Sequence, residues 1–400
     1  MAKVSVAAMR VSGLRPRFTT LPPLALYIHV PWCVRKCPYC DFNSHALDGE
    51  LPERAYVDAL IADLDQALPL VWGRRVYTIF FGGGTPSLLS AESIERVLSA
   101  VRARVHLATG AEVTLEANSG TVESAKFAAF RAAGVNRLSV GIQSFDRTYL
   151  GKLGRIHDDA QARAAARIAR EHFDNFNLDL MYALPGQAID DVRADLVAAL
   201  EFEPPHLSLY HLTIEPNTYF HRYPPQVPDD DTAADMQVLI ERVTRENGFD
   251  HYETSAYARP GFRCRHNLNY STFGDYLGIG AGAHSKLSFV DRIVRQARYR
   301  QPRQYMEQAL VGGATQTDQT VAPAEIAFEF MMNALRLSDG FALSLFAERT
   351  GLPTTVVLPM LDRAEAKGLI VRDYERAAPT ELGRRFLNDL LQMFLPDAIS

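Results

Sequence analysis

The sequence predicts an α/β fold in which a partial, open barrel of six strand–helix units precedes a smaller helical domain. Short apolar strands alternate with amphipathic helices over residues 24–212, and this alternation is typical of a parallel sheet covered by helices. A closed eight-unit barrel usually takes about 250 residues. Because this segment is shorter than about 200 residues and offers six strands, we predict a partial (β/α)6, TIM-like barrel that stays open.

Each expected strand is short and rich in β-branched, Leu or aromatic residues, as strands commonly are. The expected strands are 24–30, 76–81, 112–116, 137–141, 175–181 and 206–212. Between them, apolar residues recur at helical spacing. One stripe, behind a candidate N-cap at Ser90, is Ile94, Val97, Leu98 and Val101, and a second is Ile189, Val192, Leu196 and Leu200. The two periodicities together predict helices between successive strands.

Beyond Leu212 the chain changes character, because prolines break up a loop-rich segment. The elements expected next are a helix over 231–246, a strand over 252–257 and a glycine-rich stretch over 274–282. A separate unit begins at Pro323 with a helical stripe of Phe328, Met331, Met332 and Leu335. The elements expected after it are helices over 341–350 and 354–367, a strand over 369–374 and a final helix from Thr380.

This last order of elements is typical of a winged helix. We therefore divide the chain into an N-terminal segment 1–23, a barrel 24–215, accessory elements 216–320 and a winged-helix-like domain 321–400. Winged helices commonly bind DNA, which requires a basic face. The last domain holds 8 Lys or Arg against 11 Asp or Glu, so we expect it to serve packing or docking, with no nucleic-acid partner.

Composition places the protein in the cytoplasm. Its 400 residues carry a formal charge of −5, with 47% apolar and 22% charged residues, the profile of an ordinary globular protein. No apolar run approaches the roughly 18 residues that cross a bilayer, and the first residues lack the apolar segment of a signal peptide. We expect no stable membrane insertion. The four cysteines, three of them within eight residues, suit a thiolate-bound metal centre in a reducing compartment.

Those three cysteines form a C-x3-C-x2-C motif directly after the first expected strand: Cys33, Cys37 and Cys40. Three thiolates on one short loop can hold three irons of a cubane cluster and leave the fourth iron open to a further ligand. The alternatives are a zinc site or a chance grouping of core cysteines. Zinc motifs usually bring two pairs of ligands, and the remaining cysteine, Cys264, is far away in sequence. The motif therefore favours a [4Fe–4S] cluster.

The motif and the strand–helix series resemble the radical S-adenosylmethionine (SAM) superfamily. The second expected strand ends in Gly82-Gly83-Gly84-Thr85-Pro86, where bare glycine backbone can approach a ligand closely. This stretch resembles the superfamily's loop for the SAM amino group. The resemblance implies that SAM chelates the open iron and that the reduced cluster cleaves it to a 5′-deoxyadenosyl radical.

Further matches resemble one branch, the oxygen-independent coproporphyrinogen III dehydrogenases and their relatives. The resemblance implies SAM contacts at Tyr27, Tyr39, Gly83, Gly84, Thr85, Glu116, Gln143, Arg155 and Asp179. Several of these follow successive strands, where barrel proteins place their chemistry. Each residue also has a plainer interpretation: Glu116 or Asp179 could cap a helix, and Tyr27 could be a core residue.

Two functions occur within this branch, and two features separate them. The dehydrogenases carry a fourth cysteine where this sequence has Phe42, and a longer N-terminal arm than the 32 residues before Cys33. Both departures count against coproporphyrinogen oxidase activity. Haem chaperones of the HemW type instead resemble this chain in Pro31-Trp32-Cys33 and in the segment Cys264-Arg265-His266-Asn267-Leu268-Asn269-Tyr270.

That segment resembles the haem-binding signature His-Asn-x-x-Tyr-Trp. It implies haem contacts at His266, Asn267 and Tyr270, with His266 as the iron ligand, since a neutral imidazole is a common axial ligand. The signature's tryptophan is replaced by Ser271; either haem binding survives without it or it is weakened. The alternative for His266 is a histidine that orders a loop. Cys264 is interpreted as a loop or core thiol.

The leading hypothesis is therefore a haem chaperone that carries a [4Fe–4S] cluster with exchangeable SAM. Its expected partners are haem and haem-accepting proteins, membrane respiratory enzymes among them. The alternative is an oxygen-independent coproporphyrinogen III dehydrogenase of porphyrin biosynthesis. A radical SAM methylase is disfavoured by the haem signature, and a winged-helix DNA regulator by the acidic C-terminal domain.

Overall fold

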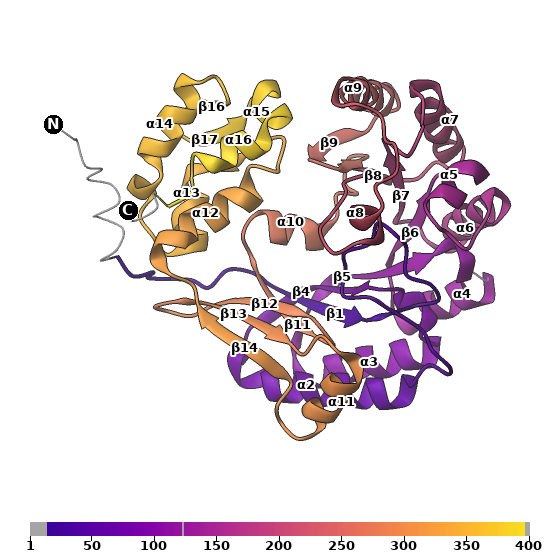
Figure 1. Cartoon of the computed structure of the whole chain (residues 1–400). Coiled ribbons are helices and arrows are strands. Elements are labelled where there is room, and N and C mark those ends of the chain that lie inside the picture. The colour runs from indigo at the N-terminus through magenta and orange to yellow at the C-terminus, as the bar shows by residue number, and fades with distance from the viewer. Residues whose placement is uncertain (1–13, 122–123, 397–400) are drawn as a thin grey trace.

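The computed structural model describes residues 14–121 and 124–396. Residues 1–13 of the expected N-terminal segment and residues 397–400 lie outside the described part. A curved sheet runs through the middle of the molecule, with helices along its outer face and a second, smaller unit beside it (Figure 1). The small elements of the loops at the strand ends are β2 (Trp32–Cys33), β3 (His45–Ala46), η1 (Pro86–Leu88) and η2 (Ser119–Thr121).

The main sheet contains twelve strands within the described residues, in the order β14-β13-β12-β11-β1-β4-β5-β6-β7-β8-β10-β9. The six expected barrel strands are confirmed as β1 (Leu24–Val30), β4 (Arg75–Gly83), β5 (His106–Asn118), β6 (Arg137–Gln143), β7 (Phe176–Tyr182) and β8 (His206–His211). They pair in parallel in this order. The predicted partial (β/α)6 barrel is therefore confirmed.

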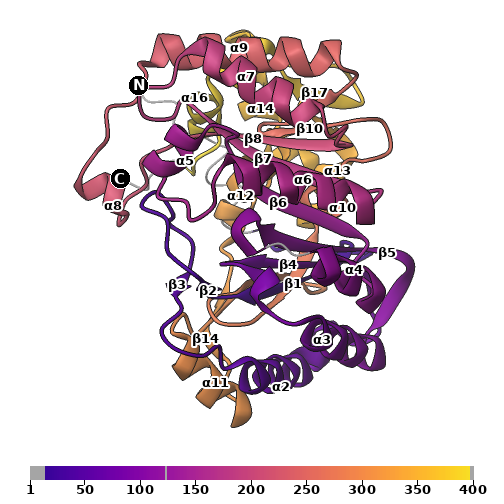
Figure 2. The same ribbon diagram turned by 90° about the vertical axis from the view of Figure 1, so that its right-hand side faces the viewer.

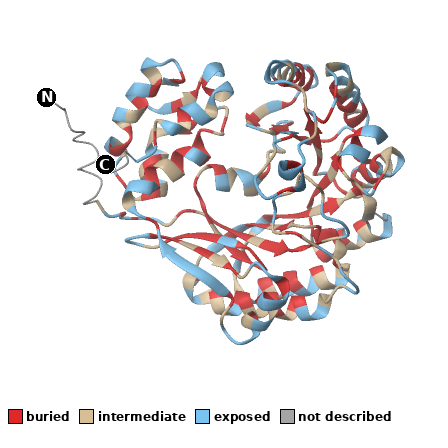
Figure 3. Ribbon diagram, in the orientation of Figure 1, coloured by how far each residue is buried: buried red, intermediate tan, exposed pale blue. Residues whose placement is uncertain are grey.

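The helices between these strands cover the outer face of the sheet. They are α2 (Glu53–Val71), α3 (Ala91–Arg104), α4 (Ser124–Ala133), α5 (Arg147–Lys152), α6 (Asp159–His172) and α7 (Ile189–Leu200). The side chain of Ser90 accepts the backbone N–H of Ser93 and caps α3, as predicted. The predicted stripe of α3 is buried against the sheet, and the main core lies between the sheet and these helices (Figure 3).

Because side chains alternate along the strands, the sheet has a second face, opposite the helices, that does not belong to the main apolar core. Ile79 and Phe81 of β4 are fully buried in the main core. Thr78 and Phe80, at the alternate positions, contact His266 on the other side of the sheet, because successive side chains of a strand point to opposite faces. We call this other side the inner face. It is where the short helix α10 (Arg265–Ser271) lies, within the curve of the sheet (Figure 1).

The segment after β8 contributes more to the sheet than the sequence indicated. It contains α8 (Tyr219–Arg222), α9 (Asp230–Glu246), β9 (Asp250–Glu253), β10 (Ala256–Ala258), β11 (Asp275–Ile279), β12 (His284–Ser288), β13 (Ile293–Arg298), α11 (Pro302–Leu310) and β14 (Thr315–Thr320). The glycine-rich stretch thus includes β11, which pairs in parallel with β1. The single strand predicted over 252–257 is wrong: β9 and β10 form an antiparallel hairpin, because the chain reverses at Thr254 and Ser255.

The C-terminal unit has its own core and its own three-stranded sheet, β15-β17-β16. Its elements are α12 (Pro323–Ala334), β15 (Phe341–Ala342), α13 (Leu343–Thr350), η3 (Thr354–Val356), α14 (Leu358–Ala366), β16 (Ile370–Arg372), β17 (Arg376–Pro379), α15 (Glu381–Arg385) and α16 (Leu387–Gln392). The ring of Phe330 packs edge-on against Phe341 and Phe346, and each such pair contributes about 1 kcal/mol. This is the helix and β-wing order that the sequence predicts.

Three details of this unit differ from prediction. Met332 is 38% exposed, so it does not belong to the buried stripe of α12. The expected helix over 341–350 begins with strand β15, since Phe341 pairs with Ala377. The expected helix over 354–367 is divided into η3 and α14, because Pro359 cannot donate a backbone hydrogen bond within a continuous helix. The domain limits 24–215, 216–320 and 321–400 stay predictions.

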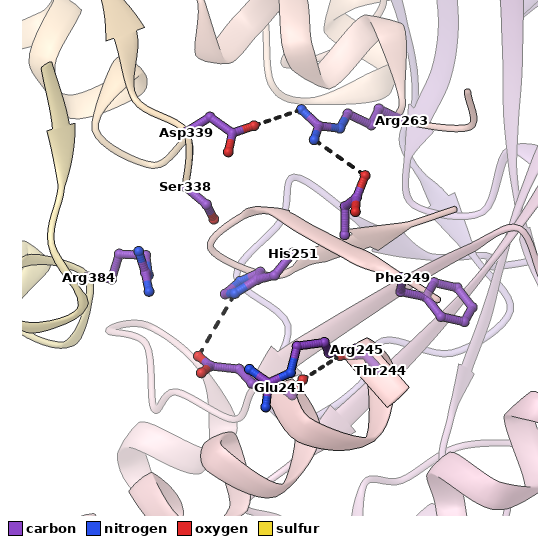
Figure 4. A pocket seen from close by; sticks show the side chains of 10 residues that line it. Glu241, Thr244, Arg245, Phe249, His251, Arg263, Ser338, Asp339 and Arg384 are labelled. Atoms are coloured by element: carbon purple, nitrogen blue, oxygen red, sulfur yellow. Dashed lines mark hydrogen bonds and ion pairs between the residues drawn. The ribbon is translucent and has the colours of Figure 1, made fainter. Parts of the chain in front are cut away.

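The C-terminal unit docks on the hairpin at the edge of the main sheet. Arg336 Nε pairs with Glu253 Oε1 at 2.6 Å, and Ser338 N–H donates to the carbonyl of Tyr252. A cavity of about 430 Å³ lies beside this contact, between the hairpin and Arg384 of α15 (Figure 4). In the described part of the chain, no helix combines the length and the apolar character needed to span a membrane.

Candidate functional site

The three motif cysteines lie on the loop that leaves the end of β1. Cys33 belongs to β2, which pairs with β3 through Trp32 and His45. Cys37 and Cys40 follow in a turn in which the Cys40 N–H donates to the carbonyl of Cys37. The three thiols are free and only half-buried. The loop is therefore open to a bound group beside the carboxyl end of the sheet, and we call the strand ends with this loop the rim (Figure 2).

Each thiol of the loop has a polar neighbour. Thr85 Oγ1 donates to Cys33 Sγ at 3.4 Å, Arg155 Nη1 donates to Cys37 Sγ at 3.6 Å, and Ser44 Oγ lies 3.6 Å from Cys40 Sγ. Burial, together with the charges of the two other cysteines, raises the pKa of Cys33. No three His, Cys, Asp or Glu side chains of the described residues converge in metal-ligating geometry. The loop therefore provides three thiols, each with a polar neighbour, which is the kind of ligand that a [4Fe–4S] cluster needs.

The glycines at the end of β4, Gly83 and Gly84, allow the two loops of the rim to meet. A Cβ on Gly84 would lie 2.5 Å from the carbonyl oxygen of Trp32, and Gly83 has φ +112° with the His29 ring against it. The Gly83 N–H donates to Glu116 Oε2 at 3.2 Å. A larger residue at position 84 would push the cysteine loop away, and one at position 83 would displace the His29 ring, so both glycines are required by packing.

Two half-buried carboxylates, Glu116 and Asp179, face the inner side near the rim. Burial, reinforced by the charge of Asp179, raises the pKa of Glu116 to about 8. Burial also raises the pKa of Asp179, which accepts hydrogen bonds from Ser139 and Asn177 at 3.0 and 2.8 Å. Two carboxyl groups with raised pKa values are typical of a binding site rather than of a packing position. Neither caps a helix, contrary to the alternative considered from the sequence.

Gln143 and Arg155 complete the rim. Gln143 ends β6 with φ +70°, which is strained for a residue with a side chain. Arg155 donates through Nη2 to the carbonyl of Gly141 at 2.9 Å while its Nη1 reaches Cys37, and its Nε is buried without a partner among the described residues. The ring of Tyr39 packs near Phe220, and burial raises the Tyr39 pKa. All the predicted SAM residues except Tyr27 thus gather at the rim or its loops.

Tyr27 connects the rim to the second half of the site. Its hydroxyl lies 3.1 Å from His29 Nδ1, and its ring stacks on Phe80. His266 lies beside both rings: its ring centre is 4.9 Å from that of Phe80 and 6.4 Å from that of Tyr27. The haem-signature histidine therefore shares the inner face with the rim, lower along the strands. We call α10 and the strand residues that it contacts the floor.

The floor holds His266 by several contacts. Its Nδ1 lies 2.9 Å from Thr78 Oγ1, and its backbone N–H donates to Glu112 Oε1 at 3.1 Å. Burial, with the charge of Arg137, lowers the His266 pKa to about 3, so the imidazole is neutral at physiological pH. Its Nε2 has no hydrogen-bond partner within the residues that the structure describes. A neutral imidazole with a free nitrogen can bind iron.

The other residues of the signature lie differently. Asn267 is exposed, and Tyr270 is 44% exposed beside the ring of Tyr276. Ser271, in the place of the signature's tryptophan, is buried. Cys264 is a buried thiol that points to Glu112, far from the cysteine loop, and burial raises its pKa to about 11. Its interpretation as a core thiol agrees with this environment.

Sequence reasoning missed the polar residues on the inner face. They are Thr78, Glu112, Arg137, Asn177 and His206, all buried. The sequence does contain a sign of this polar face, because polar residues alternate along β5 at Glu112, Thr114 and Glu116. A strand covered by apolar layers on both faces is instead hydrophobic at almost every position. The 430 Å³ cavity of Figure 4, lined in part by His251, Arg263 and Arg384, contains none of the predicted site residues.

Comparison with known proteins agrees with this geometry. The radical SAM superfamily matches residues 27–198, and the HemN C-terminal domain matches residues 321–386. The solved structure of the radical SAM enzyme coproporphyrinogen III oxidase (HemN) from Escherichia coli superposes with a TM-score of 0.79, covering 94% of this chain and 90% of that one at 23% identity. Fold and cysteine loop together define a radical SAM protein, a class that implies a [4Fe–4S] cluster and SAM.

Curated relatives narrow the class. The heme chaperone HemW of Escherichia coli (strain K12) is 49% identical over 94% of this chain and 99% of its own length, and that of Haemophilus influenzae is 44% identical with the same coverage. The mouse (Mus musculus) mitochondrial protein called radical S-adenosyl methionine domain-containing protein 1 is 36% identical over 98% of this chain and 94% of its own length. The chain belongs to the HemW family.

Proposed function

We propose that this protein is a haem chaperone: it binds haem at the floor, with His266 as the iron ligand, and transfers it to acceptor haem proteins. The observation that carries this proposal is the state of His266, which is neutral, held by its Nδ1 and free at Nε2. The similarity to heme chaperones over almost the whole chain, at 49% and 44% identity, supports the same function.

The rim is proposed to hold the resident groups. Cys33, Cys37 and Cys40 would hold a [4Fe–4S] cluster, which together with bound SAM would supply one-electron radical chemistry at the rim. The chain's own residues surround that position. Thr85 and Arg155 donate to two of the sulfurs, and such donors stabilise thiolate charge.

The remaining contacts to SAM are proposed from the resemblance to radical SAM proteins, with the positions of these residues at the rim in support. Glu116 and Asp179 would meet the cationic ligand, the backbone of Gly83 and Gly84 its amino group, and Gln143 its ribose. At the floor, Asn267 and Tyr270 would contact haem from the exposed side of α10. Tyr27, between the two groups of residues, would touch whatever occupies either one.

The partners and the compartment are proposed more broadly. Acceptors such as respiratory haem enzymes in a membrane would receive the haem, and the C-terminal unit, residues 321–400, would act as the docking domain. A chain with no membrane-spanning helix in its described part and three free thiols on one loop suits the cytoplasm. Transient docking on a membrane complex would then bring the carrier to its acceptor.

The test is a haemin titration of anaerobically reconstituted protein, followed by the Soret band, with His266→Ala as the comparison. We expect saturation near one haem per chain, and a loss of at least about tenfold in affinity, or about 1.4 kcal/mol, in the variant. Absence of specific binding by the wild type would contradict the proposal. The coproporphyrinogen III dehydrogenase alternative would then have to be tested. This alternative is disfavoured because the exposed Phe42 stands in the place of a fourth cysteine.

A further inference from the structure

The floor contains a contact pattern that neither the cysteine loop nor the haem signature requires. Thr78 of β4 and Glu112 of β5 are direct partners in the register of these two parallel strands. Both side chains are buried, and both reach the same residue, His266. Two neighbouring strands of the rigid sheet therefore hold one histidine of a short, separate helix.

Glu112 holds the backbone of this histidine. Its two carboxylate oxygens accept the N–H groups of Arg265 and His266 at 3.2 and 3.1 Å. These are the first N–H groups of α10, which has no side-chain cap of its own at Cys264. The first N–H groups of a helix need an outside acceptor, and here an acceptor from about 150 residues earlier in the chain fixes where the helix starts.

Thr78 holds the ring. The Thr78 hydroxyl lies 2.9 Å from Nδ1 of the ring. When this hydroxyl oxygen accepts from Nδ1–H, the imidazole takes the tautomer whose Nε2 carries a lone pair. The ring of Phe80 packs at 4.9 Å and limits its rotation. A hydrogen bond to one ring nitrogen is the usual device that orients a metal-binding histidine through the other.

We propose that Thr78 and Glu112 are positioning residues that present Nε2 of His266 to haem iron before haem arrives. The inference rests on the proposed function, which names His266 as the ligand. It adds that β4 and β5 hold His266 in its iron-binding orientation before haem binds. Asn267 and Tyr270, which are exposed, do not share this support.

Labelled-histidine NMR of the full reconstituted chain without haem tests this arrangement directly, with the His266 signals identified by their loss in His266→Ala. The expected spectrum shows a single tautomer protonated on Nδ1 in the wild type and in Thr78→Ser. Thr78→Val should abolish that preference, and Glu112→Gln should broaden it. Unchanged His266 signals in both Thr78→Val and Glu112→Gln would overturn the proposal.

Thr114→Val is the matched control. Thr114 is also a buried threonine, two residues along β5 from Glu112, and its hydroxyl has no hydrogen-bond partner among the described residues. The same loss of one hydroxyl should leave the His266 signals unchanged. The NMR comparison needs only folded protein without haem, so a haem-binding defect in a variant does not obscure it.

Haemin titration of the same variants supplies the second measurement. Loss of such an orienting partner typically weakens metal binding by roughly tenfold or more, so we expect this for Thr78→Val, a smaller loss for Glu112→Gln, and near-normal binding by Thr78→Ser. If His266→Ala impairs binding and neither Thr78→Val nor Glu112→Gln does, the positioning role fails and the proposed function stands. If His266→Ala binds haem as the wild type does, both fail.

Discussion

The rim and the floor of the inner face are built by different means. The rim gathers side chains from a loop and several strand ends, its thiols are half-buried, and its ligands do not converge within the described residues. The floor is a seven-residue helix whose key histidine is fixed by two partners in adjacent strand positions. The rim is thus assembled from several separate segments, whereas the floor holds one histidine by two side chains of neighbouring strands.

The largest expected effect separates the two regions. Cys33→Ala should abolish cluster assembly, because two thiolates cannot hold the cubane, whereas Cys264→Ser should retain it. Haem affinity of the cluster-free variant should stay within about twofold of the wild type, because Thr78 and Glu112 hold His266 without the cysteine loop and sites that share no partners usually behave independently. Iron and sulfide analysis together with the haemin titration measure both quantities. A parallel loss of haem binding would show that rim and floor are one unit.

The close contact of the two rim loops predicts the next effect. Gly84→Ala would drive a Cβ into the Trp32 carbonyl and should cost about 1–3 kcal/mol of stability, as overpacking does. Gly151→Ala is the control, since a Cβ there meets nothing within 4 Å. Thermal unfolding of both variants checks the difference, and equal midpoints would contradict the packing of the loops.

The pKa of Glu116 predicts a pH dependence that belongs to the rim alone. At about 8, this pKa leaves the carboxyl protonated at lower pH. The sulfonium of SAM favours the ionised form, so binding must release the proton whenever the pH is below 8. Affinity for SAM should therefore rise with pH by up to about tenfold per unit below 8 and level off above it.

Equilibrium binding of SAM to the cluster-loaded protein between pH 6 and 9 would measure that slope. Glu116→Gln should bind SAM with a flatter profile, because the titrating group is gone. Haem affinity should show no such slope, since His266 stays neutral over this range. A pH profile that is the same in Glu116→Gln would assign the slope to another group.

The smallest effect is expected at the exposed side of the floor. Tyr270→Ala removes a half-exposed ring that contacts Tyr276, so stability should change by only about 0.5 kcal/mol. Haem affinity should fall by about 1 kcal/mol or less, the scale of one aromatic contact. Calorimetry and the Soret titration measure the two. A loss of haem affinity as large as that of His266→Ala would contradict the proposal that haem is held chiefly through His266 and the strand residues that position it.

Much of the barrel could be predicted because its signals are local. The six parallel strands and the Ser90 cap follow from short apolar runs and a helix-start residue. Strand β11 could not be predicted, since its glycine and tyrosine residues resemble a loop until β1 supplies a parallel partner. The hairpin of β9 and β10 was merged into one strand because its turn contains only Thr254 and Ser255.

The site divides in the same way. The cysteine spacing and the glycine loop are visible in sequence because their residues are neighbours. The support of His266 is not, because Thr78, Glu112 and His266 meet only through strand register and chain return. Alternation of polar residues along β5 indicates that one face of the sheet is polar, but it does not identify the histidine that this face holds.

A haem chaperone of this kind would carry haem on His266 and release it to an acceptor protein. The direct measurement is to load the anaerobic protein with one haem, mix it with an apo haem protein, and follow the acceptor's Soret spectrum after separation. We expect transfer of close to one haem per chain from the wild type, and little haem loaded or transferred by His266→Ala. Transfer by the variant equal to that of the wild type, or none by the wild type, would contradict it.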